Sequence, residues 1–228
     1  MSGFGFPMLV RLCCMLCPCV GIIISPPKGT TKTFLPGSNA SLTWEFNDTI
    51  SFNSSSRNWF FNGVKLASII DNNIRKIFNY TGLSGIEIVK PGTLRLHNVN
   101  QSYNGTYKFT VETKEAGYDL SKVTVFIAEK PNVTVNCSSS ITLNKGDDVT
   151  CVCRGEGGNP PANVTWFKDG KQIAEIKKEN QTLTLNNVDE TAQGNYTCLA
   201  ESHPNPGYKD KKTIVVQVNC KYNLYLNH

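Results

Sequence analysis

The chain has 228 residues, of which 39% are hydrophobic and 18% are charged, and its formal net charge is +5 at pH 7. This length suits two domains of ordinary size, and the composition is that of globular domains rather than of a disordered chain. The lysines and arginines are scattered instead of gathered in a stripe, so a nucleic-acid partner is not indicated.

An apolar run, Leu12 to Ile24, follows Arg11 near the amino terminus. It is short for a membrane span and Pro18 interrupts it, whereas a basic residue before such a run is typical of a secretory signal. We predict a signal peptide over residues 1–24, with Gly21 or Ser25 near the cut; an uncleaved signal anchor is the alternative. We therefore expect an extracellular protein, secreted or at the cell surface, which meets a membrane only through a segment absent from this sequence.

The chain is rich in Asn-x-Ser/Thr sequons for N-linked glycosylation, which agrees with export. Eleven occur, against roughly four expected by chance from the composition. They begin at Asn39, Asn47, Asn53, Asn79, Asn100, Asn104, Asn132, Asn136, Asn163, Asn180 and Asn195.

One pattern of residues occurs twice. A Trp-x-x-[Asn/Asp]-Gly unit is followed by Leu-x-Leu, a valine and Gly-x-Tyr, with six positions from the valine to the glycine in both copies. The first copy has Trp59, Leu94, Val99, Tyr107 and Phe109; the second has Trp166, Leu183, Val188, Tyr196 and Cys198. Such a repeat predicts two similar modules.

Short segments with a two-residue apolar period alternate with Gly, Asn and Pro turns, as in Val149 to Cys153 and Lys122 to Ile127. Period-2 strands at this spacing predict an all-β chain of two sandwiches. We place the domains at residues 25–128 and 129–220, joined by a very short linker, with a polar tail over 221–228. A short linker predicts a semi-rigid rod.

The spacing Cys153…Trp166…Tyr196-x-Cys198 resembles the immunoglobulin fold. The resemblance implies that a Cys153–Cys198 disulfide joins the two sheets, that Trp166 packs on it and that Tyr196 forms a tyrosine corner. The sequence departs from the family pattern at Ala192, where an aspartate is usual, so the corner's salt bridge is not expected.

The first module carries aromatic residues where the second carries the bridge. The frame Gly37-x-x-Ala40-x-Leu42-x-Trp44 aligns Trp44 with Cys153, and Phe109 aligns with Cys198. With Trp59 and Tyr107 they are expected to form a core held by packing alone. The first module also has 94 − 59 = 35 positions from Trp59 to Leu94, against 183 − 166 = 17 in the second. Two extra strands fit there, so it resembles a variable-type domain, and the second a constant- or intermediate-type domain.

The remaining cysteines suggest a second bridge. Cys137 and Cys220 lie on the expected first and last strands of the second module, and we predict that they are joined. A cysteine-free first domain and a doubly bridged second resemble the signalling lymphocyte activation molecules; the cysteine-free tip also resembles the carcinoembryonic-antigen-related adhesion molecules. Cys151 is then a buried thiol, with two alternatives: it replaces Cys153 as the partner of Cys198, or it forms an intermolecular bond.

No arrangement of residues indicates catalysis. His97, His203 and His228 lie outside any motif for nucleophilic, phosphate or metal chemistry, and Cys151-x-Cys153 lacks a second ligand pair. We predict that the chain is not an enzyme and has no cofactor or metal.

A binding surface is predicted on the first domain. No sequon begins within the expected C, C′, F and G strands, at about 58–70 and 106–128. Alternation there places seven side chains outward on the bare sheet: Phe60, Lys108, Thr110, Glu112, Lys122, Thr124 and Phe126. Variable-type members often use this face for adhesion, so the resemblance implies a protein partner or a second copy. The alternatives are a soluble decoy or humoral binding protein, and the ectodomain fragment of a larger signalling receptor.

Overall fold

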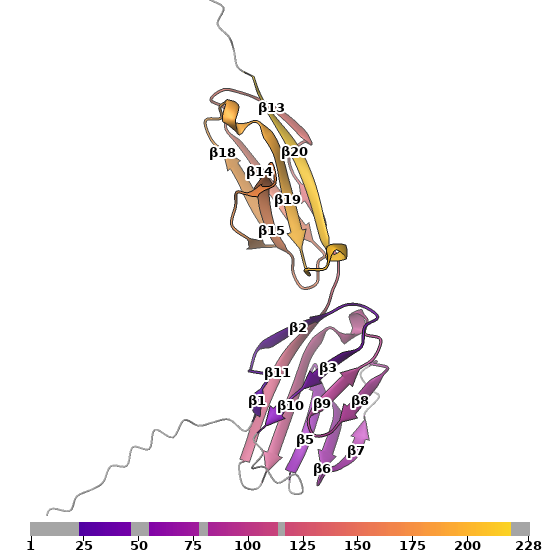
Figure 1. Ribbon diagram of the computed structural model, residues 1–228. Helices are drawn as coiled ribbons and strands as arrows, with labels where there is room; N and C mark the ends of the chain where they lie inside the picture. Colours follow the sequence, from indigo (N-terminus) through magenta and orange to yellow (C-terminus); the bar gives the residue numbers. More distant parts are fainter. Residues whose placement is uncertain (1–22, 47–54, 78–81, 114–116, 220–228) are drawn as a thin grey trace, which may run out of the picture.

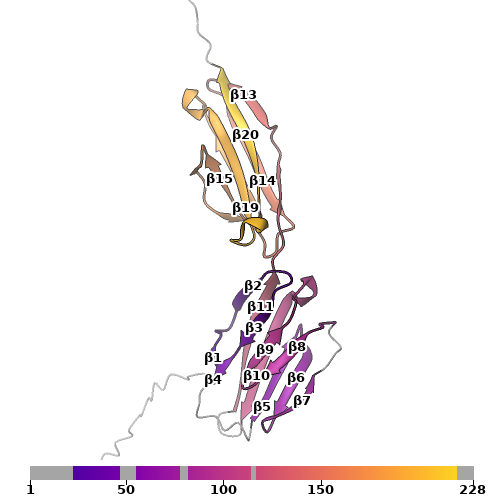
Figure 2. The same cartoon turned by 45° about the vertical axis from the view of Figure 1, so that its right-hand side comes forward.

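The computed structural model describes residues 23–46, 55–77, 82–113 and 117–219. These residues form two immunoglobulin-like β-sandwiches stacked end to end, one following the other along the chain (Figures 1 and 2). The last strand of the first domain, β11 (Gly117–Ile127), is followed after four residues by the first strand of the second, β12 (Asn132–Val135).

The larger sheet of the first domain has six strands in the order β2-β11-β10-β5-β6-β7. Their bounds, besides β11, are β2 Thr30–Phe34, β10 Gly105–Thr113, β5 Ser55–Phe61, β6 Val64–Ile70 and β7 Asn73–Ile77. The additional residues between Trp59 and Leu94 thus contribute β6 and β7 to this sheet. Burial alternates along β5 and β10, so one face of the sheet packs on the core and the other faces outward.

The facing sheet has the order β3-β9-β8, with β3 Ala40–Thr43, β9 Thr93–Leu96 and β8 Ile86–Val89. Beside it, β1 (Ile23–Ser25) pairs with β4 (Glu45–Phe46). The strand β1, at the start of the described residues, therefore overlaps the range 1–24 predicted as a signal peptide. Of the two cleavage positions considered, Gly21 leaves β1 intact and Ser25 removes it.

The second domain has sheets β12-β14-β18 and β13-β20-β19-β15-β16, with β17 paired to β15. The strand bounds are β13 Ser140–Asn144, β14 Val149–Glu156, β15 Asn163–Lys168, β16 Lys171–Gln172, β17 Lys177–Lys178, β18 Asn180–Leu185, β19 Gly194–Glu201 and β20 Lys209–Asn219. Short 3-10 turns complete the two domains: η3 Gln101–Tyr103, η4 Glu190–Ala192 and η5 Pro206–Tyr208.

The repeated Trp-x-x-[Asn/Asp]-Gly unit has a structural reason. Asn62 accepts a hydrogen bond from the backbone N–H of Thr106 at 2.9 Å, and Asp169 accepts one from Asn195 at the same distance. The residue before each donor is a glycine, because a Cβ on Gly105 would lie 2.4 Å from the Asn62 side chain. The unit therefore fixes the start of β10 and of β19 against the preceding turn.

The tyrosine corner also occurs in both domains. The hydroxyl of Tyr196 donates to the backbone carbonyl of Ala192 at 2.9 Å, and that of Tyr107 donates to the carbonyl of Tyr103 at 3.1 Å. Because the acceptor is a backbone carbonyl, Ala192 can provide it even though the aspartate that is usual at this position is absent. Burial raises the pKa of Tyr196, so the hydroxyl stays a donor at neutral pH.

An aromatic cluster occupies the place of the disulfide in the first domain. Phe109 stacks on Trp44 with ring centroids 5.3 Å apart, and it also contacts Phe46 at 5.9 Å and Trp59 at 5.0 Å. Trp44, Trp59 and Phe109 are at most 1% exposed. In the second domain Cys153 and Cys198 are bonded, with Trp166 and Tyr196 buried in the same core.

The predicted Cys137–Cys220 bridge is wrong, and so is the free thiol predicted for Cys151. Cys137 is bonded to Cys151, with their Cα atoms 5.6 Å apart. The antiparallel register that pairs Val135 with Cys153 brings Cys137 opposite Cys151 two residues later. Cys151 and Cys153 point inward from the same strand, so the two disulfides lie side by side in one core.

The error came from the path of the chain after Cys137. The segment switches sheets there, and it is β13, not β12, that pairs with the last strand β20. Their parallel register begins at Ser140↔Val215 and ends at Asn144↔Asn219. Cys137 thus precedes one end of this ladder while Cys220 follows the other end, outside the described residues.

Candidate functional site

The candidate site is the outward side of β11, β10, β5 and β6, called here the front face. Its members are Asn58, Phe60, Lys65, Ser68, Ile70, Lys108, Thr110, Glu112, Tyr118, Leu120 and Lys122. Antiparallel register aligns them in rows, with Phe60 opposite Lys108 and Lys108 opposite Lys122. The predicted Thr124 and Phe126 point to the same side nearer the second domain, beside Thr31 and Thr33 of β2. All seven predicted positions therefore share one side of the sheet; their use in binding stays a prediction.

Two lysines cover the ring of Phe60. The Nζ atom of Lys108 lies 4.0 Å from the ring centroid and that of Lys65 lies 5.7 Å from it. Cation–π attraction holds both ammonium groups over this half-buried ring. Phe60 is thus a fixed apolar base under positive charge rather than a freely exposed aromatic.

The centre of the front face is flat and tightly packed. Thr110 is only 4% exposed and Ser68 only 6%, with Asn58 between them donating to the Thr110 hydroxyl at 3.5 Å. Thr110, predicted as a contact residue, is therefore a buried part of the surface floor. Side chains at the rim are more accessible than this centre.

Sequence reasoning missed the most accessible apolar side chains of this face. Tyr118 is 57% exposed and Ile70 is 39% exposed, while Leu120 lies half-buried between Tyr118 and Lys122 along β11. The strand β11 begins at Gly117, but outward side chains were assigned on it only from Lys122, five residues later. The alternation of Tyr118, Leu120 and Lys122 was the signal that could have located it.

Positive charge dominates the front face. Lys65, Lys108 and Lys122 contribute positive charge to this face, and Glu112 contributes negative charge. None of these lysines makes an ion pair with a described residue. Lys108 and Lys122 are directly opposite on neighbouring strands, which is a repulsive arrangement.

The sequons lie elsewhere. In the first domain Asn39 is between β2 and β3, and Asn100 caps η3. In the second, Asn132 and Asn180 lie on the β12-β14-β18 sheet, Asn163 and Asn195 on the other sheet, and Asn136 just after β12; all are exposed. Asn47, Asn53 and Asn79 fall outside the described residues. Both sheets of the second domain thus carry sequons, and the described front face carries none.

Asn104 is a sequon residue with a structural task at the boundary between the domains. Its side-chain oxygen accepts from Ile127 N–H and from Asn159 Nδ2, each at 2.6 Å, and its Nδ2 donates to the Gln101 carbonyl at 2.9 Å. Asn159 also exchanges two backbone hydrogen bonds with Glu129 of the linker. Both the oxygen and the nitrogen of the Asn104 side-chain amide therefore make hydrogen bonds at the domain junction.

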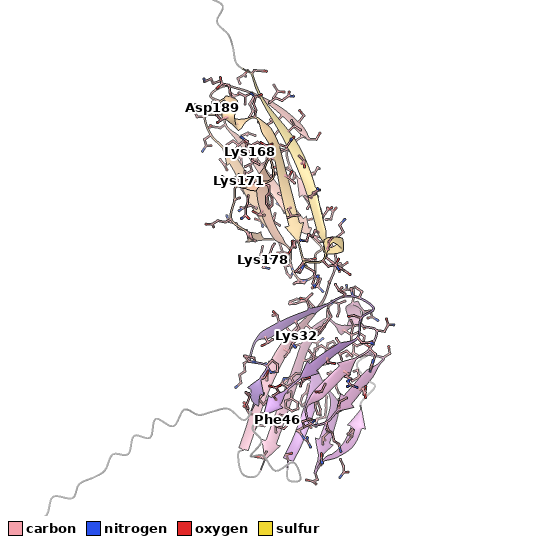
Figure 3. The ribbon with its side chains drawn as sticks, in the orientation of Figure 1. Lys32, Phe46, Lys168, Lys171, Lys178 and Asp189 are labelled. Carbon is pink, nitrogen blue, oxygen red and sulfur yellow. A yellow bond between two sulfur atoms is a disulfide. The ribbon has the colours of Figure 1, made fainter. Side chains whose placement is uncertain are left out.

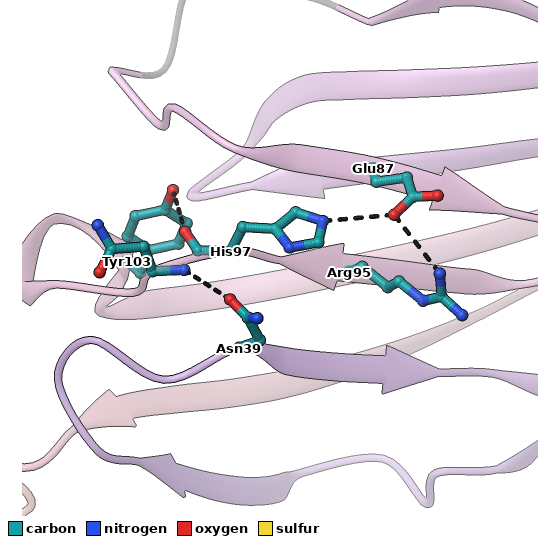
Figure 4. Close-up of polar contacts among 6 residues, drawn as sticks. Asn39, Glu87, Arg95, His97 and Tyr103 are labelled. Carbon is teal, nitrogen blue, oxygen red and sulfur yellow. Dashed lines mark hydrogen bonds and ion pairs between the residues drawn. The ribbon is translucent and has the colours of Figure 1, made fainter.

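His97 makes ordinary surface contacts. His97 lies 3.3 Å from a carboxylate oxygen of Glu87, which Arg95 approaches at 3.5 Å, on the outer side of β8 and β9 (Figure 4). All three side chains are about half exposed. Within the described ranges, no three His, Cys, Asp or Glu side chains are grouped to hold a metal ion, and no helix has the length and apolar content to cross a membrane.

Residues 130–202 match the family described as immunoglobulin domain. Curated relatives include hemicentin-2 of Mus musculus, 31% identical over 135 residues (59% of this chain and 2% of that protein). Myelin-associated glycoprotein of Rattus norvegicus is 35% identical over 88 residues (39% and 13%), and neural cell adhesion molecule 1 of Bos taurus is 30% identical over 118 residues (48% and 14%). The chain thus spans a small fraction of the length of these relatives.

Solved structures show the same fold. The complex of Dpr2 Ig1-Ig2 with DIP-Theta Ig1-Ig3 contains a similar chain with a TM-score of 0.54 at 19% identity, covering 86% of this chain and 66% of that one. Murine CEACAM1b has a TM-score of 0.52 at 15% identity, covering 82% and 96%. At these identities the likeness establishes the two-domain arrangement of sandwiches and no further property.

Proposed function

We propose that this chain, whose residues 130–202 match the immunoglobulin domain family, is an extracellular recognition protein that binds a protein partner through the front face of its first domain. The observation that carries the proposal is a contrast between surfaces. The described front face has accessible apolar side chains and no sequon, whereas both sheets of the second domain carry sequons. A surface that a partner must cover has to stay clear of glycans.

The rim supplies anchors for a partner. Tyr118 and Ile70 lie at opposite edges of the flat centre, and aromatic and aliphatic anchors contribute much of the affinity of protein interfaces. An interface of ordinary size needs ~800 Å² from each partner, which a sheet of four strands can provide. The relative named as a neural cell adhesion molecule, and the complex between immunoglobulin domains, support a protein as the ligand.

The charge favours a partner that differs from this chain. Two front faces brought together would place Lys65, Lys108 and Lys122 of each copy near those of the other, with Glu112 as the acidic counterpart. An acidic partner would instead relieve the repulsion between Lys108 and Lys122. We therefore favour heterophilic recognition of an acidic protein surface over self-association.

A multimeric probe made from the full chain would test the proposal on cells or on an array of extracellular proteins. The variant Tyr118→Asp combined with Lys108→Glu should abolish binding while the Tm changes little, because both side chains lie on the outer side of the sheet and outside the core. Arg95→Glu, a charge reversal on the opposite sheet, is the matched control and should bind as the parent does. Binding that survives the front-face variant but is lost in Arg95→Glu would place the site on the other sheet.

A further inference from the structure

A groove of about 190 Å³ lies on the outer side of the β15-β19 sheet of the second domain. Its floor is formed by Thr165 and Leu199, which are paired across the two strands, and its walls by Phe167 and Ile176. Ile176 is 58% exposed although it is apolar. The front-face proposal does not use this groove.

One end of the groove is made by a residue that can carry a sugar. Asn163 lines the groove, is exposed, and begins the sequon Asn163-Val164-Thr165. It is opposite Glu201 on β19 and Lys178 on β17, and Lys178 lies at the end of this domain nearest the first (Figure 3). No described residue hydrogen-bonds to the Asn163 side chain, in contrast to that of Asn104.

We propose that the first two N-acetylglucosamine units of a glycan on Asn163 lie in this groove, so that the sugar is a packed part of the second domain. The inference rests on the extracellular location proposed above. Each unit has an apolar face of C–H groups and an acetyl methyl, which suit an aromatic and aliphatic lining. Its hydroxyl and amide groups meet the polar edge formed by Glu201 and Gln172.

Each of the two N-acetylglucosamine units can be assigned a position in the groove. Asn163, Thr165 and Phe167 point to the same side of β15, and the distance along the strand from Asn163 to Phe167 is ~13 Å. The first unit would cover Thr165 between Leu199 and Ile176, and the second would reach the ring of Phe167. Because the glycan is tethered at the end of the groove, even weak contacts are well populated.

The location argues against a protein as the occupant. Asn163 borders the groove, and Asn195 lies on the same outer row of β19 as Leu199. A protein approaching this sheet would meet glycans at both positions. The chain's own sugar would cover Ile176 and Phe167, so the exposure of these apolar side chains does not require a protein partner.

The test uses the full chain secreted from cells that glycosylate, with mass spectrometry of each sequon. Asn163→Gln should lower the Tm of the second domain by ~4–8 °C, and in a Phe167→Ala background the same change should have little effect. Asn180→Gln, which removes a sequon on the opposite sheet, is the matched control and should leave the Tm unchanged. In the native protein, an endoglycosidase should release the Asn163 glycan several-fold more slowly than the Asn180 glycan, and Phe167→Ala should remove this difference.

Equal effects of Asn163→Gln in the two backgrounds, or equal release rates in the parent, would overturn the inference. An unoccupied Asn163 beside an occupied Asn180 would also overturn it, and would leave the front-face proposal standing. A chain without glycan at any sequon would instead contradict the extracellular location on which both proposals depend.

Discussion

Asn159 of the second domain donates its side-chain amide to the side-chain oxygen of Asn104 of the first domain, at 2.6 Å. The same nitrogen lies 2.7 Å from the carbonyl oxygen of Ile127, the last residue of β11. Two side-chain amides and one strand end therefore hold the domains at a junction that has only four linker residues. This relationship has consequences for glycosylation and for the stiffness of the rod.

We predict that the Asn104 sequon is unoccupied in the folded protein. A glycan would have to be attached to the nitrogen that donates to Gln101, in a half-buried position between two domains. Site-resolved mass spectrometry of the secreted chain should find unmodified Asn104 and glycan at Asn132, which is exposed on β12. Full occupancy of Asn104 would mean that the junction is not closed as described.

We also predict that Asn159→Ala loosens the junction. The change removes the donor to Asn104 and Ile127 but leaves the backbone pair between Asn159 and Glu129. Small-angle scattering should show a broader distribution of end-to-end distances, with each domain's Tm nearly unchanged. Asn205→Ala, which alters an exposed turn of the second domain, is a control and should not affect the distribution.

Two of the core tryptophans, Trp44 and Trp166, should respond differently to replacement by phenylalanine. Trp166 Nε1 donates to the carbonyl of Gln181 at 3.1 Å, whereas Trp44 Nε1 is buried with no hydrogen-bond partner among the described residues. Trp166→Phe loses that bond, worth about 0.5–1.5 kcal/mol net, while Trp44→Phe removes an unsatisfied donor. Denaturant unfolding of each variant should therefore give a larger loss of stability for Trp166→Phe. An equal or larger loss for Trp44→Phe would contradict the geometry of the aromatic cluster.

Much of the fold could be predicted because the repeat fixes equivalent positions. The shared frame from Gly37 to Trp44 and from Gly146 to Cys153 was enough to find the Trp44–Phe109 contact in the place of a disulfide. The extra length after Trp59 was enough to indicate additional strands. These inferences use spacing within one strand or one loop, which a single sequence displays directly.

The pairing of Cys137 could not be obtained in this way. It depends on which sheet the segment after β12 joins, and that choice is made by register between distant strands rather than by local pattern. The prediction of the front face was incomplete for a similar reason. The start of β11 at Gly117 depends on its pairing with Thr113 across the hairpin, so Tyr118 was not assigned to the outward face although it lay within the expected range 106–128.

Removal of the second disulfide should destabilise the second domain. Cys137 and Cys151 close a loop with a sequence separation of 14, for which Cys137→Ser is expected to cost about 3 kcal/mol. Cys220→Ser is the matched control and should leave stability unchanged, because Cys220 is not the partner of Cys137. Peptide mapping under non-reducing conditions should recover Cys137 linked to Cys151. A linked Cys137–Cys220 peptide, with destabilisation by Cys220→Ser, would restore the pairing first inferred from the sequence.

Acid should weaken the first domain partly through Asp119. Burial alone would raise the pKa of this carboxyl, but hydrogen bonds from the N–H groups of Ile23 and Leu120, together with Lys28 at 3.6 Å, outweigh it and hold the pKa below the ordinary 3.8. A pKa that is lower in the folded state gives stability that is present above pH 3.8 and is lost as the pH falls below it. Asp119→Asn should therefore be less stable than the parent at pH 7, and the difference should shrink as the pH approaches 2. Chemical unfolding across this range measures it, and a difference that is constant with pH would show that the ionised carboxylate does not hold β1 in place.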